Sequence, residues 1–285
     1  YRDSTGRLLF LIQPDIITQN ISQFGPFAYR SNASSYLNLI WPISLFLLIQ
    51  LGRENLDYRK KRIGNGPEIL LIPCMIITIS GPIISSARGG ALVMIGLFIL
   101  VAFSFLFIRV KSNFIRISLP MSLFAGILIA YYLGWEQILP RLENIFSGSI
   151  ESRTKIYMAT LNMIKDYGIF GSGPGSFETI MQFELGGDLT RWESWAHNDY
   201  LEFYLTFGMI GSVILIASGL LIACLFLLEY VRSQLAFFQW FCFLSLFGVA
   251  IHALGDFPLQ THSILILSCI ITSLLTVTYK PHYKN

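Results

Sequence analysis

Charged side chains are scarce in this chain. Asp, Glu, Lys and Arg make up 13% of its 285 residues, whereas 54% of the residues are hydrophobic. A typical soluble domain has a charged share of roughly 25%, so the composition excludes a soluble enzyme of this length. The hydrophobic residues are grouped in runs of about 20, the length that a helix needs to cross the hydrocarbon core of a bilayer. We therefore expect an all-α integral membrane protein.

Cysteine is also rare, and metal-ligand clusters are missing. The histidines and carboxylates do not occur at the spacing of a metal site, and a net charge of +3 is too small to indicate a nucleic-acid partner. We expect no metal, no cofactor and no nucleic acid. The cysteines lie inside apolar runs, where they are more typical of small hydrophobic residues than of disulfides: Cys74, Cys224, Cys242 and Cys269.

Two further signatures are absent. The chain begins at Tyr1 without the charged segment and apolar core of a signal peptide, and we expect a fragment whose earlier spans have been cut off. The glycine-rich run GSGPGSF at residues 171–177 lacks the lysine and the Ser or Thr of a P-loop. It also lacks the strand context of a dinucleotide site, so we interpret it as a structural turn.

The apolar runs divide the chain into four regions. Residues 1–34 form an extracytoplasmic lead-in, residues 35–134 hold spans one to four, residues 135–199 form a large extracytoplasmic loop, and residues 200–285 hold spans five to seven with a cytoplasmic tail. We expect a polytopic helical bundle with about seven spans in this chain. The expected spans are Tyr36–Leu51, Ile69–Ile84, Ala91–Ile108, a run ending near Gly134, Tyr200–Leu228, Phe237–Leu254 and a run ending near Thr278.

Lysine and arginine are distributed unevenly between the short loops. If alternate loops face the same side, one side holds nearly all of these residues, and the opposite short turns hold only Arg88. Short cytoplasmic loops carry an excess of Lys and Arg, so the loop 135–199 should face away from the cytoplasm. The residues on the predicted cytoplasmic side are Arg53, Arg59, Lys60, Lys61, Arg62, Arg109, Lys111, Arg116, Arg232, Lys280 and Lys284.

The stretch from Ser152 to Gly211 is the largest polar piece of the chain, and it carries Arg153 and His197. Guanidinium groups suit phosphate because they are permanently charged, planar and able to bind through two N–H groups. Arg88 lies between two apolar spans, where a charge needs a partner or a water-facing position. The alternatives are a snorkelling side chain at a helix end for Arg88 and a solvated helix face for Arg153.

His197 is the sharpest single candidate, because it stands just before a long apolar segment with Asn198 and Asp199 beside it. We predict that it caps the entry to the following helix, with Glu202 nearby. A hydrogen-bonded structural histidine is the alternative. Asp256 lies in the turn between the last two expected spans, where it could accept hydrogen bonds at a helix terminus or pair with one of the arginines.

The aromatic residues around His197 have two interpretations. They could form the interfacial belt that is common in membrane proteins, or the tryptophans could stack on a sugar ring. These residues are Trp192, Trp195, Tyr200 and Tyr204.

Several ordered motifs carry a resemblance to a known family. They are GPFAYRSNASSYLNLIWP before the core, SSARGGAL at a helix start, SRTKIYMATLNMIKDYGIFGSGPGSF in the loop, AHNDYLEFYLTFGMIG into a span, and HALGDFPLQTHSILIL near the end. From these motifs, the chain between Gly25 and Leu275 resembles the O-antigen ligase and polymerase superfamily of bacterial envelope glycan enzymes.

The resemblance implies a metal-independent, inverting membrane glycosyltransferase that uses an undecaprenyl-diphosphate-linked oligosaccharide or polysaccharide donor at the periplasmic face of the inner membrane. The acceptor would be a glycan or the lipid A core. The family's functional positions match Arg88, Arg153 and His197, with Asp256 at the matching acidic position, and Arg191 is a further candidate for substrate binding. The arginines would stabilise the diphosphate leaving group, and the histidine would hold or deprotonate the acceptor hydroxyl.

Other functions stay open at this point. A polysaccharide polymerase would use the same donor and extend a lipid-linked glycan. A small-anion transporter of the same fold would line a permeation path with the arginines, although ionisable residues are sparse in the expected spans. A non-catalytic assembly protein would only bind the lipid-linked glycan.

Overall fold

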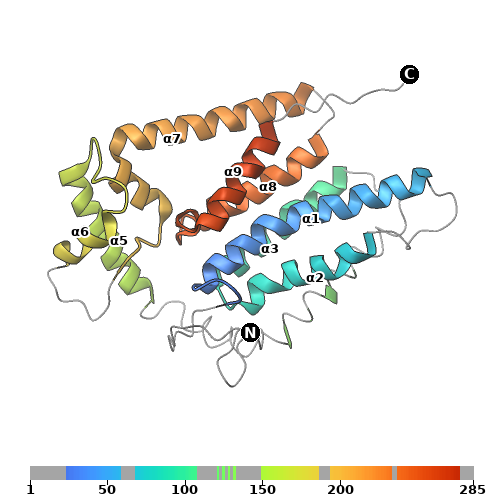
Figure 1. The fold of residues 1–285 in the computed structure, drawn as a ribbon, viewed down its shortest axis with the longest axis horizontal. Coiled ribbons are helices and arrows are strands. Elements are labelled where there is room, and N and C mark those ends of the chain that lie inside the picture. Colours follow the sequence, from blue (N-terminus) through green and yellow to red (C-terminus); the bar gives the residue numbers. More distant parts are fainter. Residues whose placement is uncertain are drawn as a thin grey trace. The chain divides into compact units, whose positions relative to one another are not determined.

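The computed structural model describes residues 24–58, 68–107, 149–185, 193–232 and 236–276, with scattered residues between 121 and 132. The chain divides into two compact units, Tyr1–Arg141 and Leu142–Asn285. Within the described residues every regular element is a helix (Figure 1), and one isolated β-bridge joins Phe24 to Phe27. The expected all-α architecture is confirmed for this part of the chain.

The continuous described segments of the first unit include three apolar helices, α1 (Arg30–Tyr58), α2 (Glu68–Ile84) and α3 (Arg88–Phe107). α1 packs against both other helices, and its Trp41 is fully buried. Asn38 donates a hydrogen bond of 2.8 Å to the Gly90 carbonyl, which joins α1 to α3. A side chain at Gly81 of α2 would collide with Leu37. The glycine therefore permits the close helix contact that small residues give in membrane bundles.

α1 begins inside the segment that the sequence placed in a polar lead-in. Its first turns carry polar side chains that are buried, so the helix extends beyond its apolar run. The buried polar residues are Ser31, Asn32, Ser34 and Ser35.

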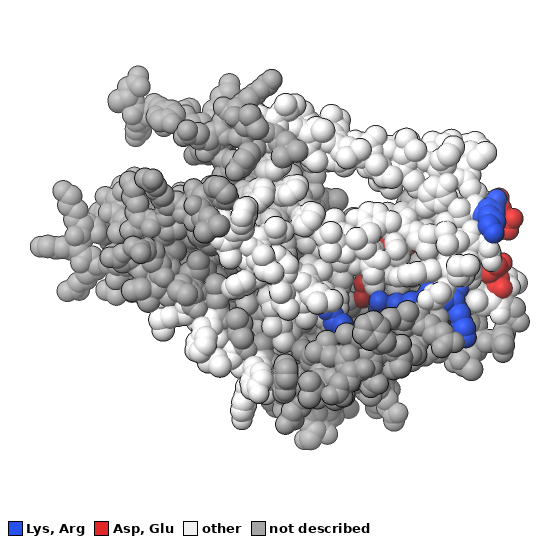
Figure 2. Space-filling view, turned by 180° about the vertical axis from the view of Figure 1, so that it is seen from behind, with Lys and Arg blue, Asp and Glu red and all other residues white. Residues whose placement is uncertain are grey.

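The second unit holds the remaining described helices. They are α5 (Ser149–Tyr167), α6 (Phe177–Glu184), α7 (Asp199–Arg232), α8 (Ala236–His252), the short 3₁₀ helix η1 (Pro258–Gln260) and α9 (His262–Thr276). α7 contacts all the others in this unit. On the face drawn in Figure 2, most visible charged side chains lie toward the side that α5 and α6 occupy. Among its described residues, the region expected as a loop therefore contains the helices α5 and α6, and it carries many of the charged side chains seen on this face.

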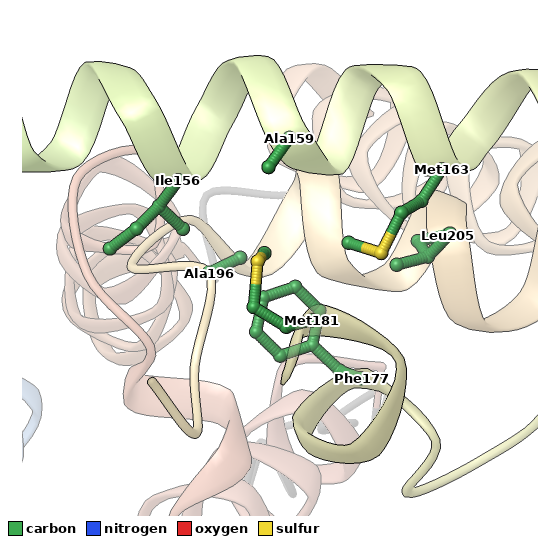
Figure 3. Packing of buried hydrophobic residues seen from close by; sticks show 7 residues of the cluster. All are labelled: Ile156, Ala159, Met163, Phe177, Met181, Ala196 and Leu205. Atoms are coloured by element: carbon green, nitrogen blue, oxygen red, sulfur yellow. The ribbon is translucent and has the colours of Figure 1, made fainter. Parts of the chain in front are cut away.

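A hydrophobic cluster joins α5, α6 and the start of α7 (Figure 3). Three of its side chains are three or four residues apart on α5, so they share one face of that helix. Two residues of α6 pack onto that face, and Ala196 anchors the segment that leads into α7. The cluster therefore fixes the backbone next to His197. Its members are Ile156, Ala159, Met163, Phe177, Met181, Ala196 and Leu205.

The expected span from Tyr200 to Leu228 is not one straight helix. α7 breaks at Gly208, whose φ of 65° and ψ of −171° are non-helical, and the chain changes direction there (Figure 1). Two amides and two carbonyls lose their helical partners, and the backbone of the loop 168–173 replaces each of them. The replacement bonds are Met209 N to Gly168 O (2.8 Å), Ile210 N to Ile169 O (3.3 Å), Ser172 N to Leu205 O (2.8 Å) and Gly173 N to Thr206 O (3.0 Å).

Two glycines make this exchange possible. Gly171 has a φ of 78°, and a Cβ atom on either Gly171 or Gly208 would collide with the backbone of the other segment. The interpretation of the run 171–177 as a turn is confirmed. The break of the neighbouring helix by this turn could not be predicted, because Gly208 lies in an apolar run typical of an uninterrupted span.

Within the described residues, two helical stretches are long and apolar enough to cross a membrane, Arg30–Leu51 and Asp199–Phe226. Helices occupy the positions of all expected spans except the one ending near Gly134, most of which lies outside the described residues. The number of spans and the side that each loop faces stay predictions. The shorter apolar helices are Ile69–Ile84, Arg88–Ser104, Phe238–His252 and His262–Leu275.

Candidate functional site

Three segments of the second unit meet around His197. They are the first half of α5, the segment that leads into α7, and the turn between α8 and α9. The Tyr157 hydroxyl of α5 donates a hydrogen bond of 2.8 Å to the His197 carbonyl. His197 Nδ1 lies 3.2 Å from Oδ1 of Asp256 in the turn. The structure therefore joins two of the predicted site residues that are far apart in the sequence.

The backbone of His197 is strained. Its φ of 53° lies in the left-handed region, which few residues other than glycine adopt and which costs about 1 to 3 kcal/mol. The edge of the His197 ring packs on Phe257, with the ring centroids 5.1 Å apart. Together with the hydrogen bonds from Tyr157 and to Asp256, this contact holds the imidazole in one orientation, and its side chain stays 21% exposed.

The prediction that His197 caps the helix is wrong in detail. α7 begins at Asp199, and the capping group is the Asn198 side chain, whose Oδ1 accepts a hydrogen bond of 3.0 Å from Leu201 N. Short amides and carboxylates cap helices better than imidazole, because their oxygen reaches the free amides of the first turn. His197 lies one residue before the cap and does not take part in it.

Two buried carboxylates fix the segments on either side of the histidine. Glu202 accepts a hydrogen bond of 2.9 Å from Ala196 N. Asp199 Oδ2 accepts one of 2.8 Å from Leu259 N, and Asp199 N donates to the carbonyls of Ala253 and Asp256. Asp199 was not predicted as a site residue. An acidic residue at the first position of an apolar helix could have marked it, because helix N-termini favour negative charge.

Asp256 is held from two directions. Its Oδ1 accepts a hydrogen bond of 3.1 Å from Phe257 N, and its carbonyl accepts the bond from Asp199 N. From the sequence, Asp256 was expected to pair with an arginine or to accept hydrogen bonds at a helix terminus. In the structure its side chain contacts His197. A carboxylate of fixed position next to imidazole Nδ1 orients the ring and selects the tautomer in which Nε2 can accept a proton.

Arg153 lies four residues before Tyr157 on α5, so both side chains are on the same face of the helix. Burial raises the pKa of the Tyr157 phenol above its ordinary value, and the positive charge of Arg153 opposes that rise. The charges of Arg153 and Asp256 also act on the His252 side chain. The arginine charge therefore reaches the cluster around His197, while the guanidinium side chain stays only partly buried.

The other predicted arginines lie outside the part of the second unit that the structure describes. Arg88 begins α3 in the first unit, directly after a turn in which Ser86 has a φ of 56°. The prediction that Arg88 and Arg153 bind the same substrate molecule stays a prediction. Arg191 lies outside the described residues.

Trp195 stacks on Phe257, with ring centroids 5.1 Å apart and planes at 12°. Since Phe257 also touches His197, the three rings form a continuous aromatic surface next to the imidazole. Trp195 is 37% exposed, so part of the indole stays accessible. The Tyr200 hydroxyl instead donates to the Ala250 carbonyl at 2.9 Å, and Trp192 lies outside the described residues.

Among the described residues, no group of three or more His, Cys, Asp and Glu side chains is placed to hold a metal ion. His252 is buried at the end of α8, and His262 is exposed at the start of α9. The groups that remain for chemistry are an oriented imidazole, a carboxylate, a phenol and a guanidinium. This set can move a proton and stabilise an anion.

Comparison with models of known protein families gives a match. The family model described as O-antigen ligase matches residues 73–216, half of the chain, and this region includes Arg88, Arg153 and His197. It ends before the turn that carries Asp256. No curated protein and no solved structure matches.

Proposed function

The chain belongs to the O-antigen ligase family, and from this premise we propose that it is a glycosyltransferase of the bacterial inner membrane. The family assembles envelope polysaccharide and works as ligase or polymerase. The proposed reaction moves a saccharide from an undecaprenyl-diphosphate carrier to a lipid A core or another glycan acceptor, with the site facing the periplasm. The observation that carries the proposal is the 3.2 Å contact between His197 and Asp256 beside Arg153.

The histidine acts on the acceptor. With Asp256 accepting a hydrogen bond from Nδ1–H of His197, Nε2 is the ring nitrogen that takes the proton of an acceptor hydroxyl. The acceptor oxygen then attacks the anomeric carbon, and the bond from that carbon to the diphosphate oxygen breaks with its electron pair. A single in-line displacement inverts the anomeric centre. Asp256 stabilises the imidazolium that forms, as a carboxylate does next to a general base.

The arginines act on the donor. Cleavage places negative charge on the leaving diphosphate, and a planar guanidinium can bind two of its oxygens at once. Arg153 is the candidate within the cluster, and we assign the same role to Arg88 and Arg191. One well-placed donor of this kind contributes about 3 to 4 kcal/mol to stabilisation of the transition state. Such donors supply the charge that a metal ion supplies in other transferases.

The aromatic surface supports a sugar substrate. The apolar face of a pyranose ring stacks on an indole, and Trp195 is partly exposed next to His197. A sugar held there would lie near the imidazole that handles the acceptor hydroxyl. If Trp195 stacks on the sugar, Trp195→Ala should reduce saccharide transfer. If Trp195 belongs only to the interfacial belt, the substitution should leave transfer unchanged.

The test uses the full-length protein in lipid nanodiscs with a lipid-diphosphate oligosaccharide, EDTA and one acceptor at a time. Transfer to the lipid A core identifies a ligase, and transfer to a second lipid-linked glycan identifies a polymerase. The wild type should transfer in EDTA, and His197→Ala should not. Donor binding without transfer to either acceptor would contradict the enzyme and favour a protein that only binds the glycan.

A further inference from the structure

The break in α7 separates a polar segment from an apolar one. Before Gly208, the buried side chains include Asp199, Glu202 and Thr206. After Gly208, the helix has no charged residue until Glu229. Its large side chains are exposed around the helix, which a protein in water does not tolerate over such a length. They are Met209, Ile210, Val213, Ile214, Leu215, Ile216, Leu220, Leu221, Leu225 and Leu228.

The length of the apolar segment matches a bilayer. From Met209 to Leu228 the helix rises by roughly 30 Å at 1.5 Å per residue, which equals the thickness of a typical hydrocarbon core. If this segment crosses the membrane, its two ends lie at the two surfaces. One end is the break at Gly208, where the chain changes direction.

The loop 168–173 is tied to the helix at that end. The carbonyls of Gly168 and Ile169 accept the amides of Met209 and Ile210, the first two residues after the break. The loop also presents two apolar side chains outward, because Ile169 is 57% and Phe170 is 80% exposed. These side chains therefore lie beside the first turn of the apolar segment, and their position is set by backbone bonds.

We propose that the break at Gly208 marks the outer surface of the bilayer and that Ile169 and Phe170 insert into the lipid there. The partner of this surface is the lipid bilayer itself. Ile169 and Phe170 are tied by backbone bonds to a helical segment whose apolar side chains are exposed over the length of a bilayer, and this favours lipid over a separate protein. The loop and the broken helix form one membrane anchor, in which two amides and two carbonyls at the break are paired with the loop before they meet hydrocarbon.

The anchor gives the loop a second role besides breaking the helix. α5 ends at Tyr167, one residue before the anchoring loop, and carries Tyr157 and Arg153. Insertion of the loop holds the end of α5 at the lipid surface. The cluster around His197 is thereby kept close to the level at which the head group of a lipid-linked substrate enters, although the anchor does not depend on that substrate.

Nitroxide labels on single cysteines test the anchor in the full chain. The exposed native cysteines are replaced (Cys74→Ala, Cys224→Ala, Cys269→Ala), and the fully buried Cys242 is kept. One variant carries Phe170→Cys, and the matched control carries Phe183→Cys. Phe183 is 81% exposed on α6, so it differs from Phe170 in position and not in exposure. The proteins are placed in nanodiscs of phosphatidylethanolamine and phosphatidylglycerol.

Collision rates with oxygen and with a water-soluble nickel chelate report the depth of each label. We expect the label at 170 to collide at least ~3-fold more with oxygen relative to nickel than the label at 183, because oxygen concentrates in hydrocarbon. Equal ratios at the two positions would overturn the anchor. Low collision rates with both reagents at 170 would also overturn it, since they indicate a covering protein. Ile169→Cys repeats the measurement if the label at 170 prevents folding.

Discussion

The two parts of α7, before and after Gly208, have opposite characters although they follow one another in a single apolar run. In the first part, Asp199 and Glu202 are buried and hold neighbouring segments by hydrogen bonds to backbone amides. In the second part, apolar side chains from Val213 to Ile216 are exposed, and none holds a charge. One run of the sequence therefore performs two tasks. The first part positions the cluster around His197, and the second part meets lipid.

The difference depends on the loop 168–173. A helix that breaks in an apolar environment leaves carbonyls and amides without partners, which costs several kcal/mol for each group. The loop supplies those partners, so the chain can turn without that cost. Substitutions on the two sides of the break should therefore fail in different ways.

The largest expected effect comes from the segment before α7. In His197→Ala, transfer should fall by at least ~100-fold, because no group accepts the proton of the acceptor hydroxyl. Donor binding should be retained, since the arginines hold the diphosphate. Single-turnover transfer and donor binding, measured separately in nanodiscs, check this.

His262→Ala is the matched control, because His262 is exposed at the start of α9, and it should keep full activity. Loss of donor binding in His197→Ala with unchanged chemistry would make the residue a donor ligand.

The next effect concerns the charge on α5. Arg153→Lys keeps the positive charge and loses the planar two-point contact with phosphate. We expect transfer to fall by ~10- to 100-fold while the protein still inserts and folds, measured as initial rates at saturating donor. Lys165→Arg, an exposed position in the last turn of the same helix, should change nothing. Full activity of Arg153→Lys would leave the solvated-face interpretation in place.

A smaller effect is expected for the carboxylate that orients the imidazole. Asp256→Asn keeps the shape of the side chain and replaces one acceptor oxygen with a donor, so the favoured tautomer of His197 changes. We expect a decrease of at least ~10-fold in kcat with little change in donor KM. A loss confined to KM would instead indicate that Asp256 contacts the substrate.

The smallest effect on activity, and the clearest on folding, should come from the break itself. Gly208→Ala places a methyl group against the Ile169 carbonyl at a φ of 65°, and it should lower the free energy of unfolding by roughly 1 to 3 kcal/mol. Gly219→Ala, in the apolar part of α7 with open space around it, should raise that free energy by up to about 1 kcal/mol. Thermal unfolding in detergent compares the two. Equal shifts would contradict a packed break.

Much of the fold could be predicted, because hydrophobic runs of spanning length leave few alternatives to helices. α2, α3, α8 and α9 lie close to the expected ranges. The helices inside the large loop could not be predicted, because the apolar faces of α5 and α6 are buried only when the two helices pack on each other. For the site, the residue types of Arg153, His197 and Asp256 suggested proton and phosphate chemistry. Asp199 and Glu202 were not recognised as residues that fix the site.

The sequence by itself determined the class of this protein, its family and the residues able to do chemistry. These follow from local properties: the share of apolar residues, the spacing of helices and the motifs around Arg88, Arg153 and His197. Only the tertiary structure decided that Asp256 meets His197 across 59 positions, and that α7 breaks at Gly208. Both depend on hydrogen bonds between distant segments. Hydrogen bonds at about 3 Å require the final positions of both partners, and no local pattern encodes those positions.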